Sequence, residues 1–267
     1  MSNPGNTIDI YKLLPKTNCR ECGLPTCMAL AAAVFKGHKD LSACPYLDRK
    51  IVKRYIRPES GSNSIEDDMQ KAVRDLQKKI PSIDLAAAAK RLEGQYNGRK
   101  LTLKILGKPF SVDDEGHMSS DIHVHPWIAI PILSYILEGQ NAPLSGKWVP
   151  FRELSSGKDW QRLYAQRCEK PLKQVADTYP ELFEDMIHLF NGQPVERHYQ
   201  SDISLVLWPL PKVPMLICYW RPDEGLDSDL NVFFDSNAEQ ILSIESLYAL
   251  ATGMVRMFEK LAFRHGY

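Results

Sequence analysis

Apolar residues recur at helical spacing in several stretches of this chain. Between residues 65 and 80 they stand three or four positions apart with charged residues between them, and Pro81 ends the pattern. A second helix is expected over 84–96, with Ser82 as a possible N-cap. The other helical patterns cover 126–138 with Pro131 in the first turns, 160–190 with breaks near Pro171 and Pro180, and 244–263.

Alternating and β-rich runs fill the stretches between these helices. Residues 101–107 and 108–114 predict a hairpin that turns at Gly107-Lys108. Further strands are expected over 146–151, 202–210, 214–220 and 230–235. Because strands and helices occur in clusters of their own kind, the sequence predicts an α+β fold, with a mostly antiparallel sheet covered by helices.

The chain is long enough for two domains of unequal size. Its 267 residues allow one small module and one domain that can bury a proper core. The best linker is GSNS at 61–64. The expected boundaries are therefore 1–60 for a small helical module, 61–81 for a linker and connecting helix, and 82–267 for an α+β domain of unknown function.

Four cysteines in the small module carry the clearest chemical signal. Cys19, Cys22, Cys27 and Cys44 are separated by two, four and sixteen residues, so the first three share one loop. Three close cysteines and a distant one followed by proline are how ferredoxin-type clusters are held, so the spacing predicts a 4Fe-4S cluster on all four. Zinc and disulfides stay open as alternatives, although structural zinc sites usually use two short Cys-x2-Cys pairs.

The residues around the cysteines favour a loop followed by a helix. Gly23 permits a backbone turn that other residues resist, and Thr26 is a candidate N-cap for a helix over 28–37 that ends at Gly37. The positive end of that helix would face the cluster. The expected helix packing sets Leu30, Val34 and Phe35 against Ile8, Ile10, Leu13 and Leu14.

This stretch resembles the four-cysteine iron–sulfur domain in the large subunit of the corrinoid/iron–sulfur protein and in the B subunit of Rnf-type electron-transport complexes. The resemblance covers about a fifth of the chain and implies one 4Fe-4S cluster. The whole chain is also similar to a family of anaerobe proteins in which this module is fused to a C-terminal domain of unknown function, which implies anaerobic metabolism but no activity. The matching residues are Asn18-Cys19, Cys22-Gly23, Pro25-Thr26-Cys27, Ala29 and Cys44-Pro45.

Composition and charge argue against several other functions. The chain is 44% hydrophobic and 25% charged, and 33 basic residues balance 33 acidic ones, so nothing favours nucleic acid. Residues 1–60 hold ten Lys and Arg against five Asp and Glu, a net charge of +5 that would offset a cluster's negative charge. No stretch is apolar enough for a membrane span and no signal peptide is evident, so a cytoplasmic location is expected. In that reducing compartment Cys168 and Cys218 would be free thiols, the first in a helix and the second buried.

The histidines of the second domain form a weaker candidate site. His117, Asp121, His123 and His125 lie close in sequence, but the further ligands that a metal needs are lacking, which favours a loop with a histidine near a helix start. Asp121 and His123 begin the corrinoid-ligating pattern Asp-x-His-x-x-Gly, yet Pro126 stands where glycine is required. A bound corrinoid is therefore possible but not favoured.

Two aspartates flank predicted strands. Asp202 and Asp235 could lie at the ends of the sheet near one pocket, although roles in turns and caps are favoured. The sequence also lacks the common motifs for nucleotide binding and hydrolysis.

The sequence therefore predicts an iron–sulfur protein that passes single electrons to a partner protein. Four cysteines saturate a cluster, so any enzymatic site would have to lie in the second domain, and whether the protein is an enzyme stays open. The alternatives are a corrinoid-associated or ligand-binding redox protein and a purely structural cluster. We expect the second domain to bind what the cluster serves, with a redox partner protein favoured over a corrinoid. The oligomeric state is left open.

Overall fold

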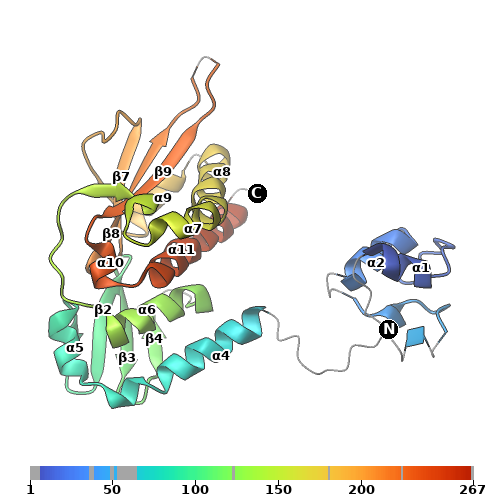
Figure 1. Ribbon diagram of the computed structural model, residues 1–267, viewed down its shortest axis with the longest axis horizontal. Helices are drawn as coiled ribbons and strands as arrows, with labels where there is room; N and C mark the ends of the chain where they lie inside the picture. Colours follow the sequence, from blue (N-terminus) through green and yellow to red (C-terminus); the bar gives the residue numbers. More distant parts are fainter. Residues whose placement is uncertain are drawn as a thin grey trace. The chain divides into compact units, whose positions relative to one another are not determined.

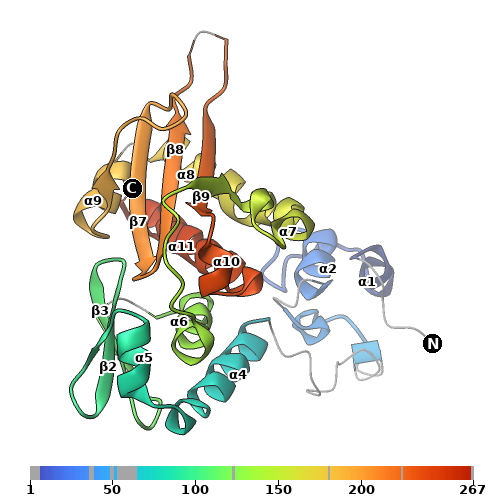
Figure 2. The same cartoon turned by 60° about the vertical axis from the view of Figure 1, so that its left-hand side comes forward.

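The computed structural model describes residues 7–35, 39–48, 51–52, 65–121, 124–179, 181–223 and 225–265 (Figures 1 and 2). The chain divides into two compact units, Met1–Asn63 and Ser64–Tyr267. The linker expected at 61–64 lies outside the described residues. In the described parts of the chain, no helix combines the length and the apolar character needed to cross a membrane.

The first unit contains two short helices and one 3-10 turn. Helix α1 spans Thr7–Leu13, α2 spans Cys27–Phe35, and the 3-10 turn spans Leu41–Ala43. The two helices pack on each other and close a small apolar cluster. The expected end of α2 at Gly37 lies outside the described residues.

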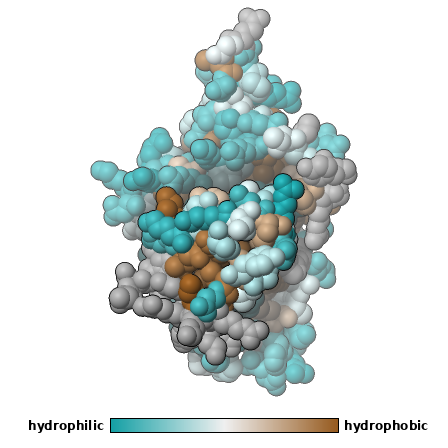
Figure 3. All heavy atoms as spheres, turned by 90° about the vertical axis from the view of Figure 1, so that its right-hand side faces the viewer, coloured by the Kyte–Doolittle hydropathy of each residue, from teal (hydrophilic) through white to brown (hydrophobic). Residues whose placement is uncertain are grey.

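The predicted packing of these helices is confirmed for five of its seven residues, Ile10, Leu13, Leu14, Leu30 and Val34, which lie in or against the cluster. It is wrong for Ile8 and Phe35, which are 57% and 46% exposed. Ile8 stands two positions before Ile10, about 200° around the helix, so it must face away. Figure 3 shows one face of the molecule, on which apolar surface is bordered in part by hydrophilic surface.

Helices make up much of the second unit, and the long helix α11 lies against α6 and α8 (Figure 1). The helices are α4 (Ile65–Gln77), α5 (Leu85–Arg91), α6 (Pro126–Glu138), α7 (Gly157–Tyr164), α8 (Lys170–Thr178), α9 (Leu182–His188), α10 (Ala238–Ile241) and α11 (Ile244–His265).

The contact between α6 and α11 depends on a proline and a glycine. Pro131 lies inside α6 and has no N–H to donate to the carbonyl of Trp127, four residues earlier. Gly253 of α11 approaches that same carbonyl so closely that an added Cβ would lie 2.7 Å from its oxygen. The proline therefore frees a carbonyl that only a glycine can approach at this distance.

Two antiparallel sheets complete the second unit, which confirms the predicted α+β class. The first has the order β1-β2-β3-β4 and the second the order β5-β9-β8-β7-β6, so the strands form two sheets instead of one (Figure 1). The strands are β1 (Gln95–Tyr96), β2 (Lys100–Ile105), β3 (Lys108–Asp113), β4 (Met118–Ser120), β5 (Trp148–Pro150), β6 (Gln193–Pro194), β7 (Ile203–Leu210), β8 (Val213–Trp220) and β9 (Asp229–Asp235).

Several local expectations need correction. The β2–β3 hairpin turns at Leu106-Gly107, since Ile105 pairs with Lys108 and both turn residues have positive φ. The N-cap of α5 is Asp84 and not Ser82, because the Asp84 carboxylate accepts the N–H groups of two following residues. The helix expected over 65–80 is confirmed as α4, and its Val73 is buried in the core of the second unit.

The break expected near Pro171 is absent from the structure. A π-helical turn over Ala165–Glu169 joins α7 directly to α8. Pro171 is the second residue of α8, directly after that turn, so the helical run continues through a residue that has no N–H to donate. The helical run does stop after Thr178 as expected, and Pro180 itself lies outside the described residues.

Candidate iron–sulfur site

The loop between α1 and α2 has an unusual backbone. Lys16, Asn18 and Arg20 have φ values of 60°, 52° and 66°, and Gly23 follows at 77°. The left-handed region costs a residue with a side chain roughly 1–2 kcal/mol, and such strain persists only where the surroundings hold it. Backbone N–H groups form anion-binding concavities where left-handed residues alternate with right-handed α residues. The left-handed residues 16, 18 and 20 recur at the spacing of that motif.

Two reciprocal hydrogen bonds join this loop to the start of α2. The backbone N–H of Cys27 donates to Asn18 Oδ1 at 2.8 Å, and the N–H of Asn18 donates to Cys27 Sγ at 3.4 Å. Thr26 caps the helix as predicted, because its Oγ1 accepts the N–H of Ala29 at 3.1 Å. The thiol of Cys27 is thus fixed at the helix start and receives an amide donor, a contact that tunes cluster potentials.

The fourth cysteine returns to the same region through the 3-10 turn. Asp40 caps that turn by accepting the N–H of Ser42 at 2.7 Å, and this hydrogen bond lowers the pKa of Asp40. Lys39 reaches back across the unit and donates from Nζ to the carbonyl of Cys22 at 2.7 Å. The segment before Cys44 is therefore tied to the loop that carries the first two cysteines.

The four predicted ligands differ in exposure. Cys27 and Cys44 are buried in the small apolar cluster, and the half-buried Cys22 packs against it. Cys19 is exposed. A site built on these residues would have a shielded side and one ligand open to the surface.

Tyr46 links the segment after Cys44 to the loop that carries the first cysteines. Its hydroxyl donates to Glu21 Oε1 at 2.6 Å, and this hydrogen bond raises the pKa of Tyr46. Glu21 stands between Cys19 and Cys22, and Tyr46 stands two positions after Cys44, so this hydrogen bond joins the two ends of the cysteine motif.

The donor set fits an iron–sulfur cluster. Within the described ranges, no three His, Cys, Asp or Glu side chains are gathered closely enough to hold one metal ion. A cubane takes each thiolate on a different iron atom, so its ligands need not converge on one point. The left-handed loop, the amide donor to Cys27 and the all-thiolate ligand set suit such a group.

The sequence did not single out the roles of Asn18, Lys39 and Tyr46. Asn18 had a usable signal, because asparagine tolerates the left-handed region and this one directly precedes a ligand. Lys39 had none, since its bond to the carbonyl of Cys22 joins residues seventeen positions apart. Tyr46 is an exposed aromatic residue whose partner, Glu21, lies 25 positions away in the chain.

The histidines do not form a site among the described residues. His125 is the N-cap of α6, with Nδ1 3.4 Å from the N–H of Trp127, as the interpretation of a histidine near a helix start predicted. His117 is exposed, and its Nδ1 lies 3.4 Å from Asp113 Oδ2 in a turn. His123 lies outside the described residues.

The two aspartates lie at opposite ends of the five-stranded sheet, so the suggestion of a shared pocket is wrong. Strands β7 and β9 both run antiparallel to β8, so they run in the same direction as each other. The start of β7 and the end of β9 therefore lie at opposite ends of the sheet. Asp202 accepts the N–H of Arg221 at 2.8 Å. Asp235 is buried and accepts donors from Ser145, Gly146 and Asn237. Both therefore act in turns.

The remaining cysteines are buried thiols. Cys218 in β8 and Cys168 in the π turn are both fully buried. Burial raises the pKa of Cys168 to about 12 and also raises the pKa of Cys218. Neither thiol is activated for nucleophilic chemistry.

Comparison with known proteins gives two matches along the chain, the first over the cysteine motif and the second over the larger unit. A family model of an Fe-S cluster matches residues 14–46, and a model described as a domain of unknown function (DUF3786) matches residues 84–257. The acetyl-CoA decarbonylase/synthase complex subunit gamma of Methanocaldococcus jannaschii is 49% identical over 43 residues, 16% of this chain and 9% of that protein. The corrinoid/iron–sulfur protein large subunit of Moorella thermoacetica is 50% identical over 44 residues, 16% of this chain and 10% of that protein.

A longer match is weaker. The subunit gamma of Methanothermobacter thermautotrophicus is 28% identical over 123 residues, 36% of this chain and 27% of that protein. The chain thus spans between 9% and 27% of the length of these three relatives. No solved structure matches the chain.

The N-terminal segment is homologous to iron–sulfur subunits, so the chain is an iron–sulfur protein. The second match covers well over half of the chain. The chain therefore belongs to the DUF3786 family, whose domain here follows an iron–sulfur cluster domain.

Proposed function

We propose that the first unit binds one 4Fe-4S cluster through Cys19, Cys22, Cys27 and Cys44, and that the protein passes single electrons to a partner protein in the cytoplasm of an anaerobe. The observation that carries the proposal is the complete set of four cysteines around a loop with alternating left-handed residues. When bound, such a cluster supplies a reversible one-electron step.

The residues around the cysteines have separate tasks in this proposal. Asn18 holds the start of α2 against the loop and donates its N–H to the sulfur of Cys27. Lys39 ties the returning chain to Cys22. The buried Cys27 and Cys44 exclude water from one side, whereas the exposed Cys19 leaves a side at which another protein can approach. Electron transfer requires such an open side.

The proposal of a partner protein draws support from the relatives. Two of them are named as a subunit of a complex and as a large subunit, which describes proteins that work in assemblies. The net charge of +5 over residues 1–60 would favour encounter with an acidic partner surface. Corrinoid binding stays less favoured, because the likeness to the corrinoid protein spans only 16% of this chain.

The cluster is tested on anaerobically purified protein. About four iron and four sulfide ions per chain are expected, as the cluster type requires, with an electron paramagnetic resonance signal after reduction. Cys44→Ala should lose the iron, and Cys218→Ala, which removes a buried thiol of the second unit, should retain it. Zinc without iron after anaerobic reconstitution would overturn the cluster assignment.

The partner is tested by anaerobic co-purification from the native host, followed by absorption spectroscopy and mass spectrometry. A redox protein that co-purifies and exchanges electrons with the cluster is the expected result. A stoichiometric cobalamin absorption band would instead favour a bound corrinoid over a redox partner protein. A cluster that no physiological reductant reduces would instead indicate a structural role.

A further inference from the structure

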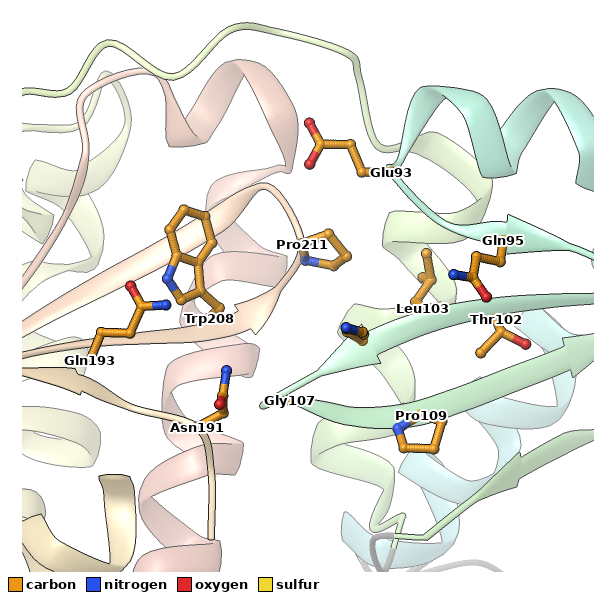
Figure 4. Close-up of a pocket in the computed structure, with 11 residues that line it drawn as sticks. Glu93, Gln95, Thr102, Leu103, Gly107, Pro109, Asn191, Gln193, Trp208 and Pro211 are labelled. Atoms are coloured by element: carbon orange, nitrogen blue, oxygen red, sulfur yellow. The ribbon is translucent and has the colours of Figure 1, made fainter. Parts of the chain in front are cut away.

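A groove of about 680 Å³ lies in the second unit between the two sheets (Figure 4). Its size is typical of sites for small molecules. Asn191, Gln193 and Trp208 gather on one side of it, and Glu93, Gln95 and Thr102 lie across from them (Figure 4). Nothing in the proposed electron-transfer function uses this groove.

The tip of the β2–β3 hairpin is fixed at the groove. The N–H of Leu106 donates to the carbonyl of Trp208 at 3.0 Å, so the hairpin is hydrogen-bonded to β7. Gly107 approaches Asn191 so closely that an added Cβ would lie 2.5 Å from the Cβ of Asn191. The two sheets therefore meet at a defined distance, and the groove between them is preformed.

Glu93 is held in a costly backbone conformation at the rim. It follows the end of α5 with a φ of 58°, at a position where helices usually place glycine. Its carboxylate lies 3.9 Å from Nζ of Lys212, whose side chain is only 8% exposed and also donates to Asn141. The buried ammonium thus draws Glu93 toward the groove while 65% of the Glu93 side chain stays exposed.

The amide side chains that line the groove have no hydrogen-bond partner among the described residues. This holds for Gln95, Asn191 and Gln193, which are exposed and each offer one acceptor and two donor hydrogens to a ligand. The half-buried indole of Trp208 offers a flat apolar face on the same side of the groove as Asn191 and Gln193, and Gln95 lies across from them (Figure 4). An aromatic face with two amides beside it and a third opposite is suited to a flat ligand with donors and acceptors on its edge.

We propose that this groove binds a purine base or nucleoside. The base stacks on Trp208, because a purine has a flat aromatic face that an indole covers well. Amide side chains read the base edge, since Asn and Gln pair with both the donor and the acceptor of a purine. Glu93 accepts hydroxyl groups of the sugar. Lys104 is the one cationic side chain among the lining residues, so the groove lacks the group of several cations that a di- or triphosphate needs.

Calorimetric titration of the full-length protein with adenosine and with guanosine tests the proposal. Saturable binding of at least one nucleoside is expected. Trp208→Leu should weaken it about tenfold or more, because stacking is lost. Asn191→Gly should weaken it several-fold with no loss of thermal stability, since glycine accepts the φ of 53° at this position. Gln174→Ala, on the exposed surface of α8, is the matched control and should bind normally.

Several results would overturn the proposal. The proposal is wrong if neither nucleoside at millimolar concentration gives a heat of binding. It is also wrong if the wild type and Asn191→Gly bind with equal affinity. The second result is sufficient even if Trp208→Leu does not fold. If glucose binds and Trp208→Leu weakens its binding as much, the groove is a sugar site and not a purine site. Adenosine triphosphate binding more than tenfold tighter than adenosine would contradict the preference for an uncharged ligand.

Discussion

The two units of this protein are stabilised in different ways. The first has one small apolar cluster, and two of its buried members are the proposed ligands Cys27 and Cys44. The second has a core that includes both sheets and the long helix α11, with Phe151 and Tyr164 stacked at 4.0 Å between ring centroids. A chain of about 60 residues buries only about 60% of the surface that its unfolded chain exposes and is marginally stable on its own. We therefore expect the first unit to depend on the proposed cluster for its stability and the second to depend on its side-chain core.

Removal of the cluster should give the largest effect, because binding energy is folding energy in small metal domains. We expect an anaerobic chelator to unfold residues 1–63 and to leave residues 64–267 folded. Limited proteolysis with mass spectrometry should then find cleavage only in the first unit. Reconstitution with iron and sulfide is the control and should restore resistance. Equal resistance before and after chelation would show that the first core needs no cofactor.

A cavity in the second core should act on that unit alone. Phe151→Ala removes a fully buried ring that also lies 5.8 Å from the ring of Phe234, so the free energy of unfolding should fall by about 3–5 kcal/mol. Denaturant titration followed by tryptophan fluorescence measures this loss, while visible absorption reports the cluster. Phe151→Leu should cost less, as it keeps most of the volume. Loss of cluster absorption at the same denaturant concentration as fluorescence would contradict the independence of the units.

Alkaline pH should weaken the second unit through a buried thiol. Burial raises the pKa of Cys168 from 9.0 to about 12, so between these values the thiol ionises in the unfolded chain and stays neutral in the folded one. The stabilisation that comes from the neutral buried thiol is therefore fully present below about pH 9. The free energy of unfolding falls as the pH rises from about 9 towards 12. Urea titrations at pH 8 and pH 10.5 measure the fall. Cys168→Ala keeps the other titrating groups and should show a smaller fall; an identical fall would rule out this thiol as its source.

Loss of one helix cap should give the smallest effect in either unit. Thr26→Ala in α2 and Asp84→Ala in α5 each remove a side-chain acceptor, at about 1 kcal/mol. In the second unit this appears as a lower denaturant midpoint. In the first unit we expect faster iron loss to a chelator, since the helix that starts at Cys27 is less well held. Ser156→Ala is the control, because Ser156 precedes α7 without a capping hydrogen bond. If Ser156→Ala lowers the stability as much as Thr26→Ala and Asp84→Ala do, the loss of a helix cap is not the cause of the lower stability.

Elements with strong periodicity could be predicted from the sequence. The hairpin at 101–114, the three strands between residues 202 and 235 and the C-terminal helix are confirmed. The hairpin and the helix have a continuous periodic pattern, and the three strands are β-rich apolar runs of strand length. The three-residue β4 was missed, since so short a strand is set by its pairing with β3. Pro171 was misjudged because the π turn that admits it depends on the helix continuing from α7.

The sequence by itself determined the candidate cluster site, because its ligands lie within 26 positions of one another and their spacing carries the chemistry. It also determined the cap at Thr26 and the separation into a small module and a larger domain. Only the tertiary structure decided the groove. Glu93, Asn191 and Trp208 come from separate segments that meet where the hairpin tip joins β7, and no local pattern records such a contact. Long-range packing places these side chains, so their shared chemistry becomes visible only in the folded chain.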